Sequence, residues 1–427
     1  MNDPIVADAR APAQRVERLR IDGARLWGSL MELARIGATP KGGVCRLALT
    51  ELDGRGRDLV VRWARAAGLT VRVDPIGNIF ARRPGRRDEL PAVMAGSHID
   101  TQPTGGKFDG NYGVLAALEV VRTLDDAAIT TEAPLEIAVW TNEEGSRFVP
   151  VMMGSGVFAG AFTLDHALAQ RDAQGISVAQ ALHSIGYAGE AHAPSLLPRA
   201  YFEAHIEQGP VLEAHGRVIG AVTGALGQRW YDLVVQGSEA HAGPTPMASR
   251  HDALLAASEI VLAVHRIALE HAPHARGTVG HVDVFPNSRN VIPGRVRLSV
   301  DLRAADDATL VQLDSALRRT VDVIAASRRV SVEVQPVVYF APQPFAPELV
   351  DAVRAGATAL GHDAMDVVSG AGHDAVYLAR VAPTAMIFVP CAGGISHNEV
   401  EAAEPAHLEA GCNVLLHAML RCAGVAA

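Results

Sequence analysis

The sequence has few cysteines, few aromatic residues and no apolar segment long enough to cross a membrane. Its 427 residues include four cysteines, Cys45, Cys391, Cys412 and Cys422, and none of them forms a CxxC pair. This spacing argues against a thiolate zinc finger and against a disulfide framework, and reduced thiols are typical of a cytoplasmic protein. No apolar run approaches the roughly 18 residues that a transmembrane helix needs. We therefore expect a soluble, cytoplasmic protein.

An excess of positive charge is also absent. The chain carries 38 Lys and Arg against 47 Asp and Glu, a formal net charge of −9. This balance gives no reason to expect a nucleic acid or an anionic membrane surface as a partner. The polar start, rich in Ala and Pro, lacks the apolar core of a signal peptide, so residues 1–20 are expected to be disordered.

Hydrophobic residues follow strand and helix patterns over most of the chain. The composition, 49% hydrophobic and 20% charged, is that of a globular protein. Apolar strands are expected over residues 90–95, 134–140 and 201–206, and helices over 45–67 and 113–124. Strand, helix and strand in this order, with polar residues where the strands end, predict an α/β domain whose sheet is flanked by helices.

The pattern changes near residue 226. Residues 227–337 are expected to form strand, helix, strand, strand, helix and strand, which is typical of an α+β, ferredoxin-like layer of one sheet and two helices. The α/β pattern returns after residue 337, so residues 21–226 and 338–427 are expected to form one domain with the smaller domain inserted. One strand of the insertion alternates four apolar residues that we expect in its core: Val296, Leu298, Val300 and Leu302.

Six residues able to bind a metal follow the apolar runs of the larger domain, each before a turn containing glycine. They are His98, Asp109, Glu143, Glu144, His205 and His397. Strand ends of an α/β sheet converge on one edge, and His nitrogens together with carboxylates suit Zn²⁺ or Mn²⁺. Two or three carboxylates with the histidines exceed the needs of one tetrahedral zinc, so a two-metal site with a bridging carboxylate is predicted.

Two details of these motifs assign roles. Consecutive residues point apart, so Glu143 and Glu144 cannot serve a metal alike, and one of them is expected to act as a general base. If the strand that ends near His98 continues, Asp100 shares its side and accepts the free ring N–H of His98. The alternative for any one of these residues is a solvated loop position without a function.

The motifs as a set resemble one family. Gly96-Ser-His98-Ile-Asp100 through Asp109-Gly, Trp140-Thr-Asn-Glu143-Glu144-Gly, His205-Ile-Glu-Gln208-Gly, Ala240-His241-Ala-Gly-Pro and Ile395-Ser-His397-Asn-Glu are similar to the N-carbamoyl-amino-acid amidohydrolases. This family comprises L-carbamoylases, β-ureidopropionases (β-alanine synthases) and allantoate amidohydrolases, within the enzymes like the M20 metallopeptidases. The similarity extends from about Leu26 to about Met419.

The resemblance implies a dinuclear site with two divalent metal ions per subunit, Zn²⁺ by expectation, with Mn²⁺, Co²⁺ or Ni²⁺ as alternatives. Asp109 would bridge the two ions, and Glu143 would be the general base. The ligands of one ion would be His98, Asp109 and His205, and those of the other would be Asp109, Glu144 and His397.

The resemblance also assigns residues that bind substrate. The smaller domain would form a homodimer and a lid, and its His241 would reach the partner's site and stabilise the oxyanion. Asn290 and Arg303 would bind the substrate carboxylate, and Gln208 would contact the carbamoyl group. The alternatives are a surface or capping role for His241 and a surface salt bridge of Arg303 with Asp301 or Asp306.

The expected reaction is hydrolysis of an N-carbamoyl amino acid, either N-carbamoyl-β-alanine or an N-carbamoyl-L-α-amino acid, to the amino acid, CO₂ and NH₃. Allantoate is the second candidate substrate. A dipeptidase or aminoacylase activity, and a binding protein without catalysis on the same fold, are further alternatives. Intact Glu143 argues against the last of these.

Overall fold

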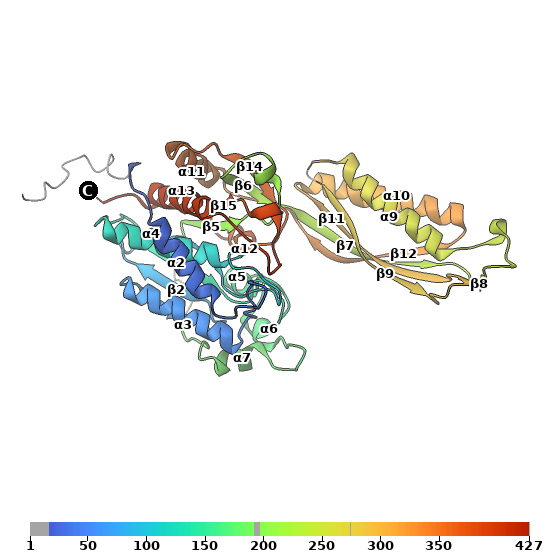
Figure 1. The fold of residues 1–427 in the computed structure, drawn as a ribbon, viewed down its shortest axis with the longest axis horizontal. Coiled ribbons are helices and arrows are strands. Elements are labelled where there is room, and N and C mark those ends of the chain that lie inside the picture. Colours follow the sequence, from blue (N-terminus) through green and yellow to red (C-terminus); the bar gives the residue numbers. More distant parts are fainter. Residues whose placement is uncertain (1–16, 192–196, 274, 427) are drawn as a thin grey trace, which may run out of the picture. The chain divides into compact units, whose positions relative to one another are not determined.

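A computed structural model describes residues 17–191, 197–273 and 275–426. It divides the chain into two compact units (Figure 1). The first contains the chain up to Thr223, Phe345–Val367 and Ala371–Ala427, and the second contains Gly224–Pro344 and Val368–Gly370. The start expected to be disordered lies mostly outside the described residues. No helix of the described ranges is long and apolar enough to span a membrane.

The first unit is built on a mixed sheet, which confirms the predicted α/β class. Strands follow the order β1-β2-β4-β3-β5-β15-β6, and β14 pairs with β6. Neighbours from β4 through β3 and β5 to β15 are parallel, whereas β1–β2, β2–β4 and β15–β6 are antiparallel. The bounds are β1 Thr70–Val73, β2 Ile79–Arg83, β3 Val93–His98, β4 Leu135–Trp140, β5 Ala200–Ile206, β6 Gly220–Ala225, β14 Met365–Ser369 and β15 Thr384–Val389.

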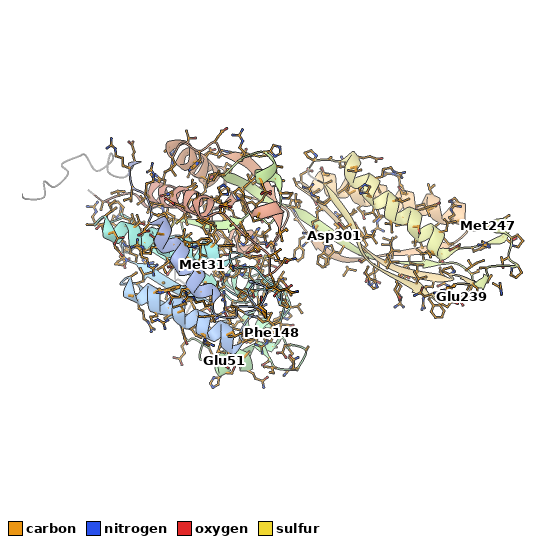
Figure 2. All side chains as sticks on the ribbon, in the orientation of Figure 1. Met31, Glu51, Phe148, Glu239, Met247 and Asp301 are labelled. Atoms are coloured by element: carbon orange, nitrogen blue, oxygen red, sulfur yellow. The ribbon has the colours of Figure 1, made fainter. Side chains whose placement is uncertain are left out.

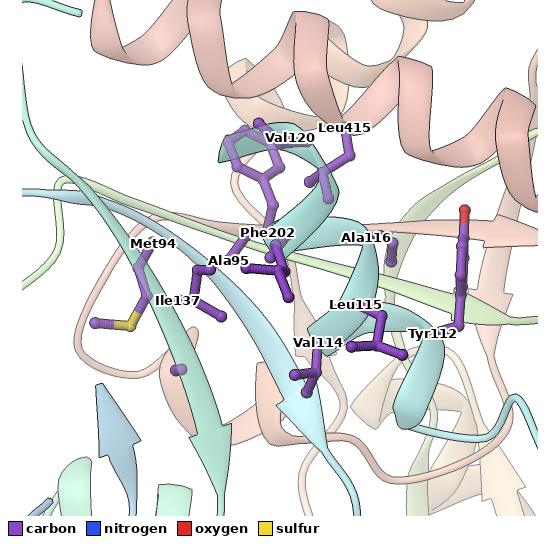
Figure 3. Close-up of a cluster of buried hydrophobic side chains, with 14 of the residues drawn as sticks. Met94, Ala95, Tyr112, Val114, Leu115, Ala116, Val120, Ile137, Phe202 and Leu415 are labelled. Atoms are coloured by element: carbon purple, nitrogen blue, oxygen red, sulfur yellow. The ribbon is translucent and has the colours of Figure 1, made fainter. Parts of the chain in front are cut away.

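Helices pack against this sheet. Helix α4 contacts β3, β4 and β5, and α13 contacts β15 and α4. Helix α2 packs on α4 and α13, and α11 packs on α13 and β15. The helix bounds are α2 Gly23–Ala34, α3 Glu51–Ala66, α4 Asn111–Asp126, α5 Met153–Phe158, α6 Leu164–Ala169, α7 Val178–Ser184, α8 Val211–Ala214, α11 Pro347–Ala359, α12 Asp374–Leu378 and α13 Pro405–Ala423. In Figure 3, apolar side chains of β3, α4 and β5 meet in the buried core, with Phe202 and Leu115 among them.

One predicted helix begins later than expected. Helix α3 starts at Glu51, and Thr50 caps it by accepting a hydrogen bond from the Asp53 amide, so residues 45–49 are not helical. The prediction of helix from residue 45 was wrong because the backbone of this segment bonds to other parts of the chain. The Cys45 amide donates to the Gly37 carbonyl, the Arg46 amide donates to the Thr101 hydroxyl, and Leu49 has a positive φ of 57°. Hydrophobic periodicity in a sequence detects the spacing of apolar residues but not such tertiary contacts.

The second unit contains a four-stranded antiparallel sheet in the order β12-β7-β11-β9, with α9 and α10 packed on it. Its elements are β7 Gly227–Gln236, α9 Ala253–Glu270, β9 Arg276–Phe285, β11 Arg295–Ala304, α10 Asp307–Arg328 and β12 Ser331–Phe340. Short strands β8 Ala240–His241 and β10 Val291–Ile292 form a separate ribbon, and β13 Gln343–Pro344 pairs with the end of β6. The four alternating residues of β11 are buried, as predicted.

Large side chains remain exposed on this unit. Met247, labelled in Figure 2, is 73% exposed in the segment after β8. Asp301, also labelled there, lies on β11 beside Arg303.

Candidate metal centre

Five of the six residues singled out as able to bind a metal are buried near the strand ends of the first unit. His98 is the last residue of β3, His205 is the next-to-last residue of β5, and Glu143 and Glu144 follow β4. Asp109 immediately precedes the turn into α4. His397, in the loop after β15, is half exposed, with 50% of its side chain accessible. The sheet therefore gathers residues that are up to about 300 positions apart in the chain.

Asp109 lies between two groups of ligands. Its Oδ1 is 3.6 Å from Nε2 of His98 and 3.3 Å from Nε2 of His205, and its Oδ2 is 3.4 Å from Nε2 of His397. Nε2 of His397 is also 3.3 Å from Oε2 of Glu144. Two atoms bound to one tetrahedral ion at about 2.0–2.2 Å lie about 3.4 Å apart. These separations fit ligands that share an ion, with a different oxygen of Asp109 facing each group.

The buried histidines present the correct nitrogen to this centre. Nδ1 of His98 lies 2.9 Å from the carbonyl of Asp100, and Nδ1 of His205 lies 2.8 Å from the carbonyl of Ile206. A carbonyl only accepts, so in neutral rings both Nδ1 atoms carry the proton and both Nε2 atoms keep a lone pair. The Gly110 amide donates to Nε2 of His205 at 3.1 Å, which requires the same tautomer.

The charges of the cluster also match a cation. Burial opposes ionisation of Asp109, yet its close contacts with the rings of His205, His397 and His98 keep its pKa well below the usual range. Hydrogen bonds to Asp109 and Glu144 raise the pKa of His397 to about 10. Two carboxylates around one imidazole hold a proton strongly, and a divalent cation would satisfy the same negative charge.

The adjacent glutamates diverge as predicted from their spacing. Oε2 of Glu143 is 3.6 Å from Nε2 of His98, whereas Glu144 faces His397 and accepts hydrogen bonds from the backbone and side chain of Gln102. Burial raises the pKa of Glu143 well above its usual value. Burial thus favours the protonated carboxyl, and a positive charge nearby would be needed to keep Glu143 ionised.

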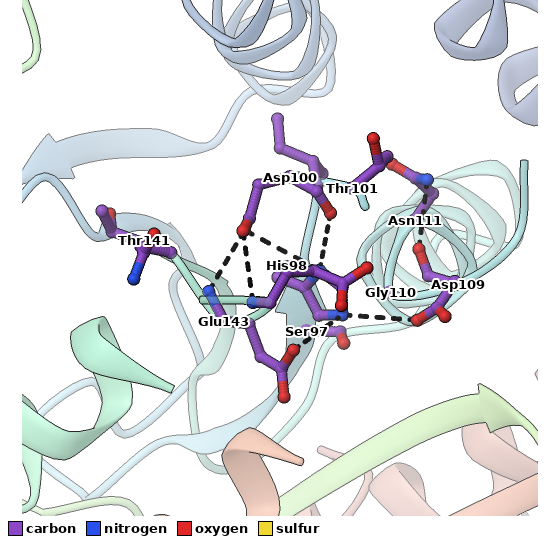
Figure 4. Close-up of polar contacts among 12 residues, drawn as sticks. Ser97, His98, Asp100, Thr101, Asp109, Gly110, Asn111, Thr141 and Glu143 are labelled. Atoms are coloured by element: carbon purple, nitrogen blue, oxygen red, sulfur yellow. Dashed lines mark hydrogen bonds and ion pairs between the residues drawn. The ribbon is translucent and has the colours of Figure 1, made fainter. Parts of the chain in front are cut away.

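Asp100 differs in one detail from the expectation. Its backbone carbonyl, not its carboxylate, lies within hydrogen-bonding distance of the ring N–H of His98, and Oδ1 is 3.8 Å from that nitrogen. Strand β3 ends at His98, so the alternation of sides does not extend to Asp100. The carboxylate instead accepts the backbone N–H of Glu143 at 3.3 Å (Figure 4). It also accepts the backbone N–H of Glu144 at 3.3 Å. Asp100 therefore links the end of β3 to the loop after β4.

Sequence reasoning missed a second layer of buried polar residues. Glu203, two residues before His205 on β5, accepts hydrogen bonds from the Ser97 hydroxyl and from the Ala375 amide. His373 is buried with its ring against that of His205, at a centroid separation of 4.7 Å. The period of two along β5 places Glu203 and His205 on one side, and this signal could have identified Glu203.

The predicted substrate residues lie on both units. Gln208 belongs to the first unit and donates to Oδ2 of Asp109 at 2.8 Å. In the second unit, His241 and Asn290 lie at the short ribbon, where the Ala242 amide donates to the Asn290 carbonyl. Arg303 forms an ion pair with Asp301 at 2.8 Å and donates to the Gly370 carbonyl. The alternative contact with Asp301 is therefore present.

Comparison with known proteins agrees with this geometry. Residues 94–421 match the family described as peptidase family M20/M25/M40. The chain belongs to this family. An N-carbamoyl-L-amino-acid amidohydrolase of Rhizobium meliloti is 46% identical over 96% of this chain and 98% of that protein. A crystal structure of an amidase of the hydantoinase/carbamoylase family from Burkholderia multivorans is 58% identical, with a TM-score of 0.93 over 95% of this chain and 98% of that one.

Another M20 relative carries a different name. An allantoate amidohydrolase of Bacillus subtilis is 36% identical over 90% of this chain and 93% of that protein. The relatives of this chain thus include one named for N-carbamoyl-L-amino acids and one named for allantoate, the two substrate types expected from the motifs.

Proposed function

We propose that this M20 protein hydrolyses the ureido C–N bond of an N-carbamoyl-L-α-amino acid, releasing the amino acid, CO₂ and NH₃. The observation that carries the proposal is the placement of Asp109, whose two oxygens face different groups of imidazole and carboxylate ligands. A dinuclear centre of this kind suits hydrolysis of an unactivated amide by water.

Two divalent cations would occupy the centre, one held by His98, Asp109 and His205, and one by Asp109, Glu144 and His397. Nitrogen and oxygen donors favour zinc, with manganese, cobalt or nickel as alternatives. Cations bound there would supply acidification of the attacking water and polarisation of the ureido carbonyl.

Glu143 is the proposed general base. Its carboxylate takes the proton from the attacking water and delivers it to the leaving nitrogen, so that no free hydroxide or free amide anion is needed. The Asp100 carboxylate and the Met152 amide both bond to the Glu143 backbone, which supports a fixed position for this side chain. Nearby cations would lower its raised pKa toward the working range of a base.

Gln208 and His241 have hydrogen-bonding states that suit the substrate. Oε1 of Gln208 is buried and has no hydrogen-bond partner among the described residues, so it can accept a ureido N–H. The Gly243 amide donates to Nδ1 of His241 at 3.1 Å, so the proton of the neutral ring is on Nε2. That N–H can donate to the oxyanion.

Asn290 and Arg303 complete the proposed contacts by binding the substrate carboxylate. The guanidinium of Arg303 would exchange the Asp301 carboxylate for that of the substrate, since both accept the same planar pair of N–H groups. The second unit would act as the lid and form a homodimer in which His241 serves the partner's site, in a cytoplasmic enzyme.

The test is ammonia release from enzyme reconstituted with Zn²⁺, Mn²⁺ or Co²⁺, using N-carbamoyl-L-methionine, N-carbamoyl-β-alanine, allantoate and a dipeptide panel side by side. The proposal expects the highest kcat/KM with the L-α-carbamoyl substrate. Faster turnover of dipeptides would contradict the proposed reaction. Allantoate is the second candidate because of the Bacillus subtilis relative, and a preference for it would retain the ureido chemistry but change the substrate.

A further inference from the structure

Glu401 is a buried carboxylate, 4% exposed, four residues after His397. It lies outside the metal-ligand groups of the first unit. Its Oε1 accepts the Phe108 amide at 2.8 Å and the Asp109 amide at 3.3 Å. One carboxylate oxygen therefore holds the backbone of the segment that carries Asp109.

The other oxygen of Glu401 leads to the side chain of Asp109. The Ser396 hydroxyl is 3.0 Å from Oε2 of Glu401 and 2.8 Å from Oδ2 of Asp109. Ser396 precedes His397 directly in the chain. Glu401 and Ser396 thus connect the Asp109 segment to the His397 loop through both backbone and side-chain contacts.

The turn before Asp109 is shaped around Glu401. A Cβ added at Gly106 would lie 2.0 Å from Oε1 of Glu401, so no larger residue fits while the carboxylate stays in place. Gly106 therefore offers a way to displace Glu401 without removing it.

These contacts concern one half of the centre more than the other. Oδ2 of Asp109, which Ser396 contacts, faces His397, whereas Oδ1 faces His98 and His205. The rings of His98 and His205 are buried at strand ends. His397 is half exposed on a loop, and its own backbone has a positive φ of 53°. Position in the sheet therefore fixes His98 and His205, whereas the loop that carries His397 depends more on polar contacts.

We propose that Glu401, acting through Ser396 and the Asp109 amide, is a positioning residue for the cation site formed by Asp109, Glu144 and His397. This inference rests on the proposed dinuclear function. It assigns no direct contact with the substrate or the cation to Glu401.

The test is titration of the metal-free full chain with Co²⁺, with stoichiometry from equilibrium dialysis and ligand geometry from visible absorption. Wild type should bind two equivalents. In Glu401→Ala and Gly106→Ala, the first equivalent should bind as in wild type and the second about 10- to 100-fold more weakly. Glu401→Gln should rescue most of this loss, because its amide oxygen can accept the same two N–H groups.

Glu213→Ala is the matched control. Glu213 accepts the Gly393 amide of the same loop at 2.9 Å but has no contact with Asp109 among the described hydrogen bonds. Glu213→Ala should bind the second equivalent of Co²⁺ with wild-type affinity. A loss of affinity as large as that of Glu401→Ala would overturn the inference. Ser396→Ala provides a second route if Glu401→Ala does not fold, and the expected weakening is the same.

The outcomes separate the two proposals. One outcome is that wild type binds two equivalents and that Gly106→Ala and Ser396→Ala bind the second equivalent with wild-type affinity, within threefold. This outcome would refute the role of Glu401 and leave the dinuclear function standing. A wild type that binds fewer than two equivalents would refute both.

Discussion

Replacement of Arg46 by Met should destabilise the first unit strongly. The Arg46 side chain is fully buried. Its Nε donates to the Ile99 carbonyl at 2.8 Å, Nη1 donates to the Leu33 and Ile36 carbonyls at 3.1 and 2.7 Å, and Nη2 donates to Oδ1 of Asn111 at 2.6 Å. One guanidinium thus joins the end of α2, the segment after His98 and the first turn of α4. Met has a similar length, so the substitution removes hydrogen bonds without opening a large cavity.

The magnitude follows from two opposing contributions. A hydrogen bond to a charged group contributes about 1.5–3 kcal/mol, so four give roughly 6–12 kcal/mol before corrections. Burial lowers the pKa of Arg46 to about 10, and a lowering of this size corresponds to about 3 kcal/mol against the charged form. Subtracting this cost from the hydrogen-bond contribution leaves about 3–9 kcal/mol. Water can reach some of the freed carbonyls at the end of α2. We therefore expect the free energy of unfolding to fall by an amount near the lower end of this range, about 3–4 kcal/mol.

Denaturant unfolding followed by tryptophan fluorescence measures this loss. Three of the four tryptophans, Trp27, Trp63 and Trp140, lie in the first unit, so a Trp230→Phe background confines the signal to it. Arg46→Lys, which keeps the charge but not the planar fork, should lie between Arg46→Met and wild type. A loss below about 1 kcal/mol in Arg46→Met would refute the reasoning.

Three further predictions concern the proposed contacts and the pH response. Arg303→Ala should raise KM about 10- to 100-fold with little change in kcat, because a charge-assisted pair to the substrate is lost, and an unchanged KM would place the carboxylate site elsewhere. A mixture of Glu143→Gln and His241→Ala protomers should recover about a quarter of wild-type activity if the site is shared, since half of the dimers are mixed and each has one complete site, and no recovery would count against it. His417 is partly buried, with Nε2 3.2 Å from the Leu19 carbonyl, and burial lowers its pKa. As pH falls, His417 is therefore protonated in the unfolded chain before it is protonated in the folded one, which favours unfolding. Between about pH 7.5 and about pH 5.5 the free energy of unfolding should fall more in wild type than in His417→Gln. Equal losses would contradict the lowered pKa of His417.

The α/β class and the gathering of the candidate metal ligands could be predicted because both follow from periodicity and from where strands end. Each of the expected strands over 90–95, 134–140 and 201–206 overlaps a strand of the sheet. The side chains that follow them meet because neighbouring parallel strands end at one edge. The divergence of Glu143 and Glu144 is likewise a property of adjacent residues.

The contacts that hold these residues could not be predicted in the same way. The backbone of residues 45 and 46 bonds to other segments instead of extending α3. Asp100 bonds to backbone amides 43 and 44 residues away, and Glu401 bonds to amides more than 290 residues away. Such contacts depend on tertiary proximity and leave no period in the sequence. Strand β6 was missed for a related reason, because its small residues Gly220, Ala221 and Gly224 carry little strand propensity.

The central claim is a dinuclear centre with Glu143 as its base, and one comparison tests it directly. Cation stoichiometry and turnover of N-carbamoyl-L-methionine are measured for wild type and Glu143→Gln under the same conditions. The account predicts two bound cations in both proteins and a kcat at least about 10²-fold lower in the variant. A variant that binds two cations and turns over at nearly the wild-type rate would contradict the assignment of the base, and a wild type without two cations would contradict the centre itself.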